Sequence, residues 1–135
     1  MGMGHDRLLK ELVLVQQTGY RHVGLLRSVH GVFRGLEPRW RKMLERRFEH
    51  FGVQAARMPQ EHFNSEGRFA TGGAHSRNVQ IFVFKAYQHR LYGIIGGIQG
   101  IQTFIGLRIV TDKKTNRADQ KLLRHVAQSF RPYHD

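Results

Sequence analysis

The segment from residue 79 to residue 110 constrains the fold most strongly, because it contains three strand-like stretches in succession. Val79–Lys85 carries apolar side chains at both alternating sets of positions, which predicts a strand buried on two faces. Arg90–Ile95 alternates in side-chain type, and Thr103–Val110 forms the third stretch. Glycines typical of turns separate the second stretch from the third: Gly96, Gly97 and Gly100. The segment therefore predicts an antiparallel meander of three strands.

The clearest helix is predicted over Glu37–Phe51. Pro38 stands in its first turn, where the missing N–H costs nothing. Apolar residues spaced by three or four predict a wide stripe, interpreted as core and not as a platform for stacking bases: Trp40, Met43, Leu44, Phe48 and Phe51. The opposite face carries Arg39, Arg41, Lys42, Arg46 and Arg47. That basic face is either a solvated surface or a functional one.

Weaker patterns predict the remaining elements. A helix is expected over His5–Gln17, a strand around His22–Val29 and a mobile, glycine-containing loop over Pro59–Asn78. The smaller expectations are a short helix over Val53–Met58, a final helix over Ala118–Phe130 capped by Asn116 with Asp119 three residues on, and a frayed tail over Arg131–Asp135. This order predicts a single α+β domain over residues 1–135, in which residues 1–35 are the least well assigned.

The charge of the chain is strongly positive and unevenly distributed. Lys and Arg number 22 against 10 Asp and Glu, giving a net charge of +12. From Gly67 to Thr111 there is no acidic residue, whereas the basic residues and histidines there are Arg68, Arg77, Lys85, Arg90, Arg108, His75 and His89. This pattern favours a nucleic acid or a nucleoprotein as partner. The alternatives are a basic protein without a dedicated partner and one whose charge is neutralised by an acidic protein.

Several function classes have no support in the sequence. The absence of Cys excludes disulfides, thiolate zinc sites and thiol catalysis. The nine His are scattered without a helical ligand spacing, and no P-loop or nucleophile elbow is present, so neither a metal nor a cofactor is expected. No apolar run reaches the roughly 18 residues of a membrane span, and the first residues lack the order of a signal peptide. We therefore expect a cytoplasmic protein without a membrane partner.

The candidate catalytic residues lie where the first two strands of the meander meet: Lys85, His89, Arg90 and Tyr92. Cleavage of RNA through its 2′-hydroxyl needs a base, positive charge on the phosphorane and a proton for the leaving oxygen. Arg supplies fixed charge, Lys or His transfers protons, and Tyr stacks on a base or donates a proton. Each residue also has a structural interpretation, with Tyr92 in the core, His89 in a surface turn and Lys85 extending from a buried strand.

The segment from about Val79 to Phe130 resembles toxins of the RelE/ParE type, particularly phage-derived relatives of the HigB kind. The resemblance is carried by Phe84-Lys85-Ala86, Arg90-Leu91-Tyr92-Gly93, the strand Thr103–Val110, Asp112-Lys113-Lys114 and the helix that begins Ala118-Asp119-Gln120-Lys121. The helix Glu37–Phe51 is similar to the helical hairpin that precedes the sheet in that family, whose first strand corresponds to the region near His22–Val29. The resemblance implies a small antiparallel sheet of three to four strands packed against helices, with residues 36–130 as its core.

The function that this resemblance implies is cleavage of mRNA on the ribosome by a metal-independent endoribonuclease, held in check by a cognate antitoxin. Arg90 resembles the arginine that contacts the scissile phosphate, and Lys85 a lysine that transfers a proton or stabilises charge. The residues expected to bind nucleic acid are Arg46, Arg47, Arg108, Lys113, Lys114, Arg117 and Lys121. The family's C-terminal catalytic His or Tyr matches Tyr133 or His134 only loosely. Two alternatives stay open, namely a gyrase-directed ParE-like toxin and a non-enzymatic basic nucleic-acid-binding protein.

Overall fold

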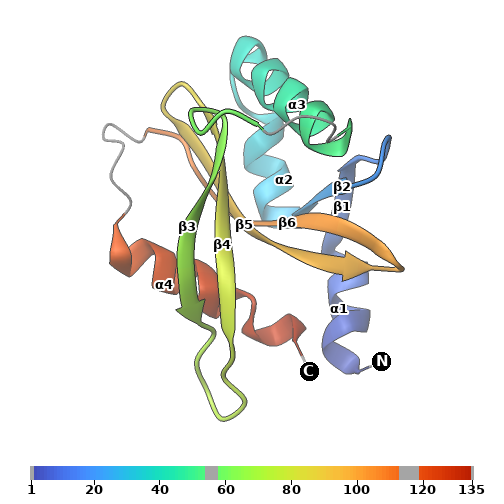
Figure 1. The fold of residues 1–135 in the computed structure, drawn as a ribbon, viewed down its shortest axis with the longest axis vertical. Coiled ribbons are helices and arrows are strands. Elements are labelled where there is room, and N and C mark those ends of the chain that lie inside the picture. Colours follow the sequence, from blue (N-terminus) through green and yellow to red (C-terminus); the bar gives the residue numbers. More distant parts are fainter. Residues whose placement is uncertain (1, 54–57, 113–118, 135) are drawn as a thin grey trace.

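The described residues form one six-stranded mixed sheet with helices on both of its faces (Figure 1). The computed structural model describes residues 2–53, 58–112 and 119–134. The strands are β1 (Leu12–Gln16), β2 (His22–Leu26), β3 (Phe63–Ala70), β4 (Asn78–Ala86), β5 (His89–Ile98) and β6 (Ile101–Val110). The helices are α1 (Met3–Glu11), α2 (Arg27–Arg34), α3 (Pro38–Val53) and α4 (Gln120–Ser129), followed by a 3-10 turn, η1 (Arg131–Tyr133). The sheet order is β1-β2-β6-β5-β4-β3, with β2 parallel to β6 and the other neighbouring pairs antiparallel.

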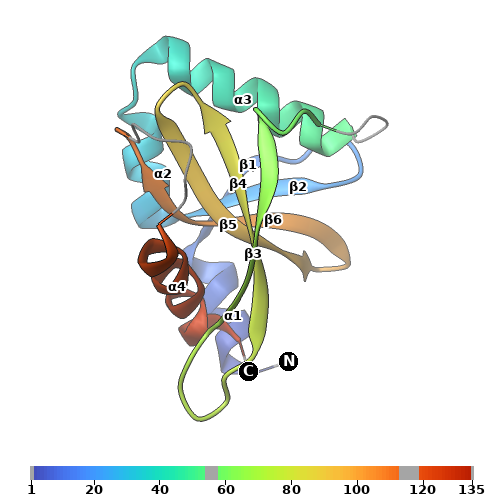
Figure 2. The ribbon, with the colours of Figure 1, turned by 60° about the vertical axis from the view of Figure 1, so that its left-hand side comes forward.

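Two pairs of helices cover the two faces of the sheet. On one face lie α2 and α3, and the Phe48 ring of α3 meets Phe84 of β4 edge-on with their centroids 5.1 Å apart. On the other face lie α1 and α4, because Leu8 of α1 and Phe130 at the end of α4 line one small cavity together with Ile105 of β6. Figure 2 shows α3 above the strands and α1 and α4 below them. Each face of the central strands is therefore buried under helices.

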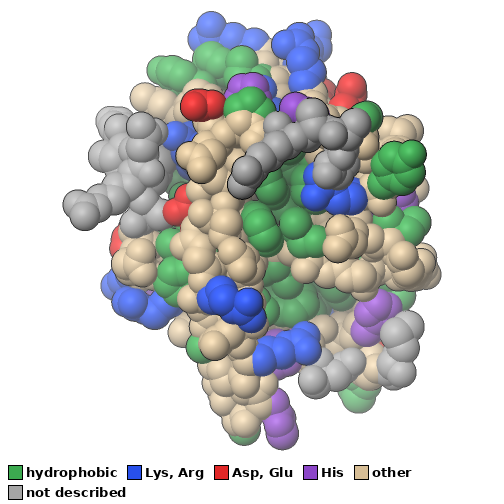
Figure 3. All heavy atoms as spheres, viewed as in Figure 1, with side chains coloured by type: hydrophobic (Ala, Val, Ile, Leu, Met, Phe, Trp, Pro, Cys, Tyr) green, Lys and Arg blue, Asp and Glu red, His purple; other side chains and the backbone are tan. Residues whose placement is uncertain are grey.

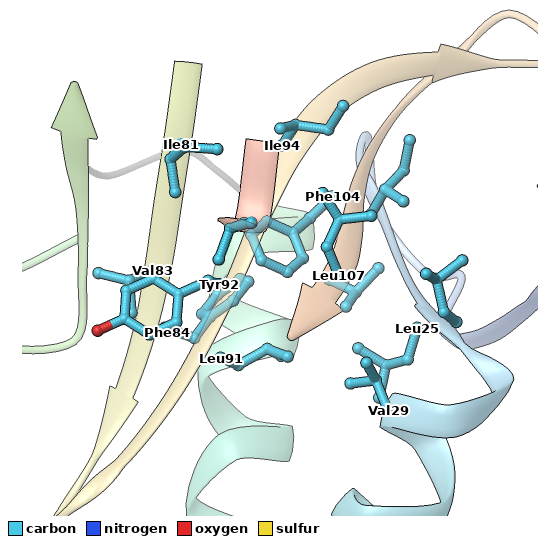
Figure 4. Packing of buried hydrophobic residues seen from close by; sticks show 14 of the residues in the cluster. Leu25, Val29, Ile81, Val83, Phe84, Leu91, Tyr92, Ile94, Phe104 and Leu107 are labelled. Carbon is cyan, nitrogen blue, oxygen red and sulfur yellow. The ribbon is translucent and has the colours of Figure 1, made fainter. Parts of the chain in front are cut away.

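Aromatic and branched side chains of the central strands fill the core. Val83 and Phe84 are both buried although they point to opposite faces of β4, as expected for a strand covered on two sides. Phe84 and Phe104 meet edge-to-face with centroids 4.7 Å apart, an arrangement that ring quadrupoles favour. Figure 4 shows these residues beside Leu25 and Val29, which come from β2 and α2. Residues from the N-terminal third thus share the core of the meander.

The meander and the central helix agree with the sequence prediction. The strands predicted over residues 79–85, 90–95 and 103–110 are confirmed as β4, β5 and β6, each slightly longer than expected. Gly96 and Gly97 lie within β5, and the turn before β6 is Gln99–Gly100, where both residues have positive φ as a type I′ hairpin turn requires. The helix predicted over residues 37–51 is confirmed as α3, which extends to Val53.

The C-terminal helix is confirmed over a shorter range, as α4. Its N-cap is Asp119, whose carboxylate accepts a hydrogen bond from the backbone N–H of Lys121 at 2.9 Å. The predicted cap, Asn116, lies outside the described residues, and so do four of the six residues of the short helix predicted over 53–58. The tail expected to fray instead forms η1, which packs against α1.

The helix predicted near the N-terminus was wrong for residues 12–16, which form a strand. The helix expected over His5–Gln17 ends at Glu11, and Leu12–Gln16 pair with β2 as an edge strand. Leu8 and Leu12 suit one helical stripe, but the β-branched Val13 and Val15 favour a strand once a partner is available. The strand expected around His22–Val29 ends at Leu26, where α2 begins.

The segment expected as a loop over Pro59–Asn78 contains a second edge strand, β3. The sequence did not indicate this strand because most of its residues are polar. In addition Gly67, with a φ of 104°, interrupts the alternation of side chains between the two faces. The pairing of β3 with β4 shifts register between Ser65 and Gly67, which marks a β-bulge. Six strands with one parallel pair therefore replace the small antiparallel sheet of three to four strands that was expected. The α+β class itself is confirmed.

Within the part of the chain that the structure describes, the helices are too short or too polar to cross a membrane.

We predict that Gly93→Ala destabilises the fold, because β5 and β6 approach each other closely at this position. A Cβ at Gly93 would lie 2.2 Å from the backbone oxygen of Ile105 and 2.6 Å from the Phe104 ring. Overpacking of this kind lowers the free energy of unfolding by about 1–3 kcal/mol. Gly97→Ala is the matched control, since a Cβ there meets nothing within 4 Å. Urea unfolding monitored by circular dichroism measures both, and equal stabilities would contradict the close approach.

Candidate active site

Strand pairing places three basic residues on one face of the sheet. Lys85 of β4 is directly opposite Arg90 of β5, and Arg108 of β6 is directly opposite Tyr92 of β5. Directly opposed residues of antiparallel strands point to the same face, and residues two apart on one strand do so too. Lys85, Arg90 and Arg108 therefore share the face that α1 and α4 partly cover. We call these three residues the basic cluster.

Lys85 is the half-buried member of the basic cluster. Its ammonium donates a hydrogen bond to the carbonyl oxygen of Gln60 at 3.0 Å. Burial lowers the pKa of Lys85 from its ordinary value, Arg90 lowers it further, and the carboxylates of Glu66 and Glu61 oppose the shift. A lysine with a lowered pKa exchanges its proton more readily near neutral pH. Lys85 therefore combines partial access to solvent with an electrostatic environment that lowers its pKa.

Arg90 is buried, with only 8% of its surface exposed. Its Nη1 donates hydrogen bonds to the carbonyl oxygens of Tyr87 at 2.7 Å and of His89 at 3.0 Å, both at the β4–β5 turn. The guanidinium is therefore fixed against the turn and its charge acts on neighbouring groups, including Lys85, whose pKa it lowers. In this position Arg90 stabilises the β4–β5 turn and lowers the pKa of Lys85. The sequence analysis had instead predicted that Arg90 contacts a phosphate directly.

Tyr92 is almost completely buried, with 1% of its surface exposed. It lies beside its cross-strand partner Val83 in the core (Figure 4). Burial raises the pKa of its phenol, the charge of Glu66 raises it further, and Arg90 opposes the shift. The phenol thus stays protonated over a wide pH range. The burial of Tyr92 agrees with its interpretation as a core residue.

Glu66 is a member of this site that the sequence analysis missed. It affects the pKa of both Lys85 and Tyr92, and its Oε1 accepts a hydrogen bond from Nδ2 of Asn64 at 2.7 Å. The bulge between Ser65 and Gly67 lies at this residue, and bulges commonly re-aim a side chain. Glu66 immediately precedes the acid-free stretch, in a segment expected to be a loop. Its position before a glycine was the one signal that could have indicated it.

His89 lies on the opposite face of the sheet from Lys85. It is paired with Ala86, and its ring centroid lies 6.3 Å from that of Trp40 at the start of α3. Burial lowers the pKa of His89; a hydrogen bond with the backbone of Thr111 opposes this shift, and Arg90 adds to it. The structure therefore divides the predicted catalytic set, with Lys85, Arg90 and Tyr92 on one face and His89 on the other.

The residues predicted to bind nucleic acid differ in their surroundings. Arg46, Arg108 and Lys121 are exposed, and Lys and Arg side chains gather at the top of Figure 3, over α3. Arg47 is half-buried and its Nε donates to the carbonyl oxygen of Lys85 at 2.6 Å, which joins α3 to β4. The remaining candidates, Lys113, Lys114 and Arg117, lie outside the described residues.

The C-terminal residues lie at the other end of β3 from Lys85. Thr71, which follows β3, shares a hydrogen bond of 2.9 Å with Nε2 of His134. Burial, together with a hydrogen bond to Glu11 of α1, raises the pKa of Tyr133 to about 12. Phe63, at the start of β3, is instead paired with Phe84, the neighbour of Lys85. Tyr133 and His134 thus tie the tail to α1 and β3 and do not join the basic cluster.

Among the described residues, no group of three or more His, Cys, Asp or Glu side chains is arranged to hold a metal ion.

Comparisons of the chain with protein-family models, with curated proteins and with solved structures find no match.

Arg46 and Arg47 are adjacent on α3 but are predicted to differ in role. Arg47→Ala removes the hydrogen bond to the Lys85 carbonyl, and a bond from a charged donor contributes about 1.5–3 kcal/mol. We therefore expect a loss of that size in the free energy of unfolding, measured in urea. Arg46→Ala is the control, because this exposed side chain is expected to change stability by less than about 0.5 kcal/mol. Equal stability losses in both variants would contradict the anchoring role of Arg47.

Proposed function

We propose that this protein acts on RNA as a metal-independent endoribonuclease, the toxin of a toxin–antitoxin pair, and that Lys85 is its central catalytic residue. The observation that carries the proposal is the cross-strand pairing of Lys85 with Arg90, beside the carboxylate of Glu66. Lys85 thus has a half-buried ammonium of lowered pKa, lies opposite a fixed cation and is under the electrostatic influence of a carboxylate. Such perturbed titratable groups are more frequent at functional sites than elsewhere.

The order of the elements is consistent with the resemblance to RelE/ParE-type toxins. One strand, β2, precedes two helices, α2 and α3, and the antiparallel strands β4, β5 and β6 follow with a final helix, α4. The resemblance implies this succession of strand, helical hairpin, meander and helix. It does not account for α1, β1 or the edge strand β3, which are additional elements of this chain.

The role that we assign to each residue of the site depends on how exposed its side chain is to solvent. In the cleavage step the 2′-oxygen passes its proton to solvent water and attacks phosphorus, and the P–O5′ bond then breaks. The ammonium of Lys85 neutralises charge on the phosphorane, donates a proton to the leaving 5′-oxygen and is reprotonated from solvent. The charge of Glu66 raises the pKa that burial lowers and so favours the protonated form of Lys85. Arg90 and Tyr92 are positioning residues that hold the turn and fill the core beneath Lys85. Arg108, which is exposed on the same face, binds the phosphate backbone.

A toxin of this kind needs a partner that suppresses it in its own cell. We propose a cognate antitoxin with acidic segments that cover the basic cluster, since the net charge of +12 favours an acidic partner. Translating ribosomes with their mRNA are the proposed target.

Non-catalytic binding of nucleic acid is the second candidate, and the burial of Arg90 favours it. The guanidinium that the resemblance assigns to the scissile phosphate is engaged with two backbone carbonyls. The exposed cations Arg46, Arg108 and Lys121 are each accessible to phosphates, and binding through them requires no turnover. The two candidates differ in whether a proton must leave Lys85.

Lys85→Arg separates catalysis from binding. Arginine retains the positive charge but cannot release a proton at accessible pH. We expect cleavage of mRNA on translating ribosomes, measured by mapping new 5′ ends, to fall by about 10²–10⁴-fold. Binding of an uncleavable RNA with a 2′-deoxy group at the cut site should change by less than about threefold.

The control for this substitution is Lys42→Arg on the exposed face of α3, which should leave both readouts unchanged. Wild-type cleavage by the Lys85→Arg variant would remove Lys85 from the mechanism. Absence of cleavage by the wild-type protein, with RNA binding intact, would support the non-catalytic candidate.

The pH dependence of cleavage follows from the pKa of Lys85. A proton donor is active below its pKa, so the rate should fall on the alkaline side, at a pH below the ordinary lysine value of 10.5. Glu66→Gln removes a charge that raises this pKa, so the alkaline limb should move to lower pH. Single-turnover cleavage of mRNA on translating ribosomes measures this limb, over the pH range in which the ribosomes stay assembled. A limb that stays in place in the Glu66→Gln variant would contradict this coupling.

A further inference from the structure

A cavity of about 570 Å³ lies on the face opposite the basic cluster, between the α2–α3 connection and the β4–β5 turn. This volume falls within the range of about 300–1,000 Å³ that is typical of small-molecule sites. The residues that matter for its chemistry are Leu36, Glu37, Trp40, Tyr87, Gln88 and His89. The cavity thus combines two aromatic rings with an imidazole, an amide and a carboxylate.

The aromatic rings are stacked at the surface and do not belong to the core. The ring centroids of Trp40 and Tyr87 are 4.5 Å apart, with 9° between the ring planes. The guanidinium carbon of Arg39 lies 4.4 Å from the centroid of the Trp40 ring. The prediction that Trp40 belongs to the buried stripe was wrong, because Trp40 is only half-buried and is not among the residues of the hydrophobic core. Tyr87 remains 59% exposed, so much of its surface is available to a further planar group.

The backbone at Tyr87 is held in an unfavourable conformation. Its φ is 57°, which is uncommon for a bulky residue and favours Gly or Asn. Gly is the usual choice at such a turn position, because it adopts positive φ without steric cost. The turn instead keeps an exposed aromatic ring there, and residues with strained backbones cluster at functional sites. The Arg90 hydrogen bond to the Tyr87 carbonyl holds this conformation in place.

Polar groups surround the stacked rings. Nδ1 of His89 is buried and has no hydrogen-bond partner among the described residues. Gln88 and Glu37 add an amide and a carboxylate to the wall of the cavity. Together these groups offer donors and acceptors to the edge of a planar heterocycle stacked on the rings, as proteins that read unpaired bases do.

We propose that this cavity binds one unpaired base of a single-stranded RNA by stacking on the Trp40–Tyr87 pair. A nucleobase fits the observations because it has a flat face for the rings and a polar edge for the imidazole and amide. The net charge of +12 favours a polyanion as the molecule that carries this base. The choice of RNA rests on the proposed function.

The base site and the basic cluster are close together along the chain but lie on different faces. Tyr87 is in the turn that joins β4 to β5, and Lys85 and Arg90 form the second residue pair from that turn. An RNA strand that crosses the end of this hairpin therefore places a base on Tyr87 and a phosphate near Lys85. The site thereby supplies an anchor for a nucleotide adjacent to the proposed cleavage position.

Trp40 is the sole tryptophan of the chain, so its fluorescence reports directly on this site. The probe is a single-stranded hexaribonucleotide, compared with an abasic strand of the same length and charge. Stacking contributes about 1–3 kcal/mol per base, so the hexamer should bind about 5–150-fold more tightly than the abasic strand. Only the hexamer should quench Trp40. Equal affinities for the two strands would overturn the base site and leave backbone binding intact.

Two substitutions at Tyr87 test the ring itself. Tyr87→Gly suits the positive φ and should retain the fold while removing the preference for the hexamer over the abasic strand. Tyr87→Phe should keep that preference, and so should the control Tyr20→Ala, which changes another exposed tyrosine. Tyr87→Asn also tolerates this backbone and serves as a second variant if Tyr87→Gly does not fold. A preference that persists in a folded Tyr87→Gly or Tyr87→Asn protein would overturn the proposal.

The outcomes separate this proposal from the nuclease function. Lys85→Arg should leave the preference for the hexamer unchanged, because Lys85 lies on the other face of the sheet. If the wild-type protein prefers the hexamer but never cleaves RNA, the base site is supported and the nuclease function is overturned. If it cleaves RNA but binds both strands equally, only the proposal of the base site is overturned. Binding of neither strand by the wild-type protein would overturn both proposals.

Discussion

The pairing of β4 with β5 through a two-residue turn determines the arrangement of the candidate site. It places Lys85 opposite Arg90, directs His89 to the other face and leaves Tyr87 at the tip of the hairpin. Because side chains alternate with a period of two, a shift of one residue in this pairing would place Lys85 and Arg90 on opposite faces of the sheet. Arg90 reinforces the pairing, since its guanidinium binds the carbonyl oxygens of the turn.

The parts of the fold that the sequence predicted well are those with a strong hydrophobic pattern. The two-sided apolar run of β4 and the helical spacing in α3 indicate buried elements directly, whatever their neighbours are. The edge strands β1 and β3 were missed because pairing with a neighbour stabilises them more than their own pattern does. Their sequences are compatible with a helix and with a loop, and tertiary structure decides between these alternatives.

The sequence predicted several residues of the candidate site, but not how exposed each of them is to solvent. That Lys85 and Arg90 meet followed from placing them on consecutive strands. Arg90 and Tyr92 are buried, and Trp40 is only half-buried. These burials depend on tertiary packing, which the helical spacing in α3 does not reveal. Glu66 joins the site through a bulge, a local irregularity without a strong sequence signal.

A buried arginine at the centre of a basic protein needs an explanation, because removing a charge from water is costly unless hydrogen bonds compensate. The turn carbonyls of Tyr87 and His89 provide such compensation for Arg90. Its charge then acts through the protein interior, where screening by salt is weaker than at the surface. The exposed cations instead act through solvent and serve to attract a polyanion. Among the described residues, positive charge is therefore divided between the buried Arg90, which holds the turn and lowers the pKa of Lys85, and surface cations suited to the phosphate backbone.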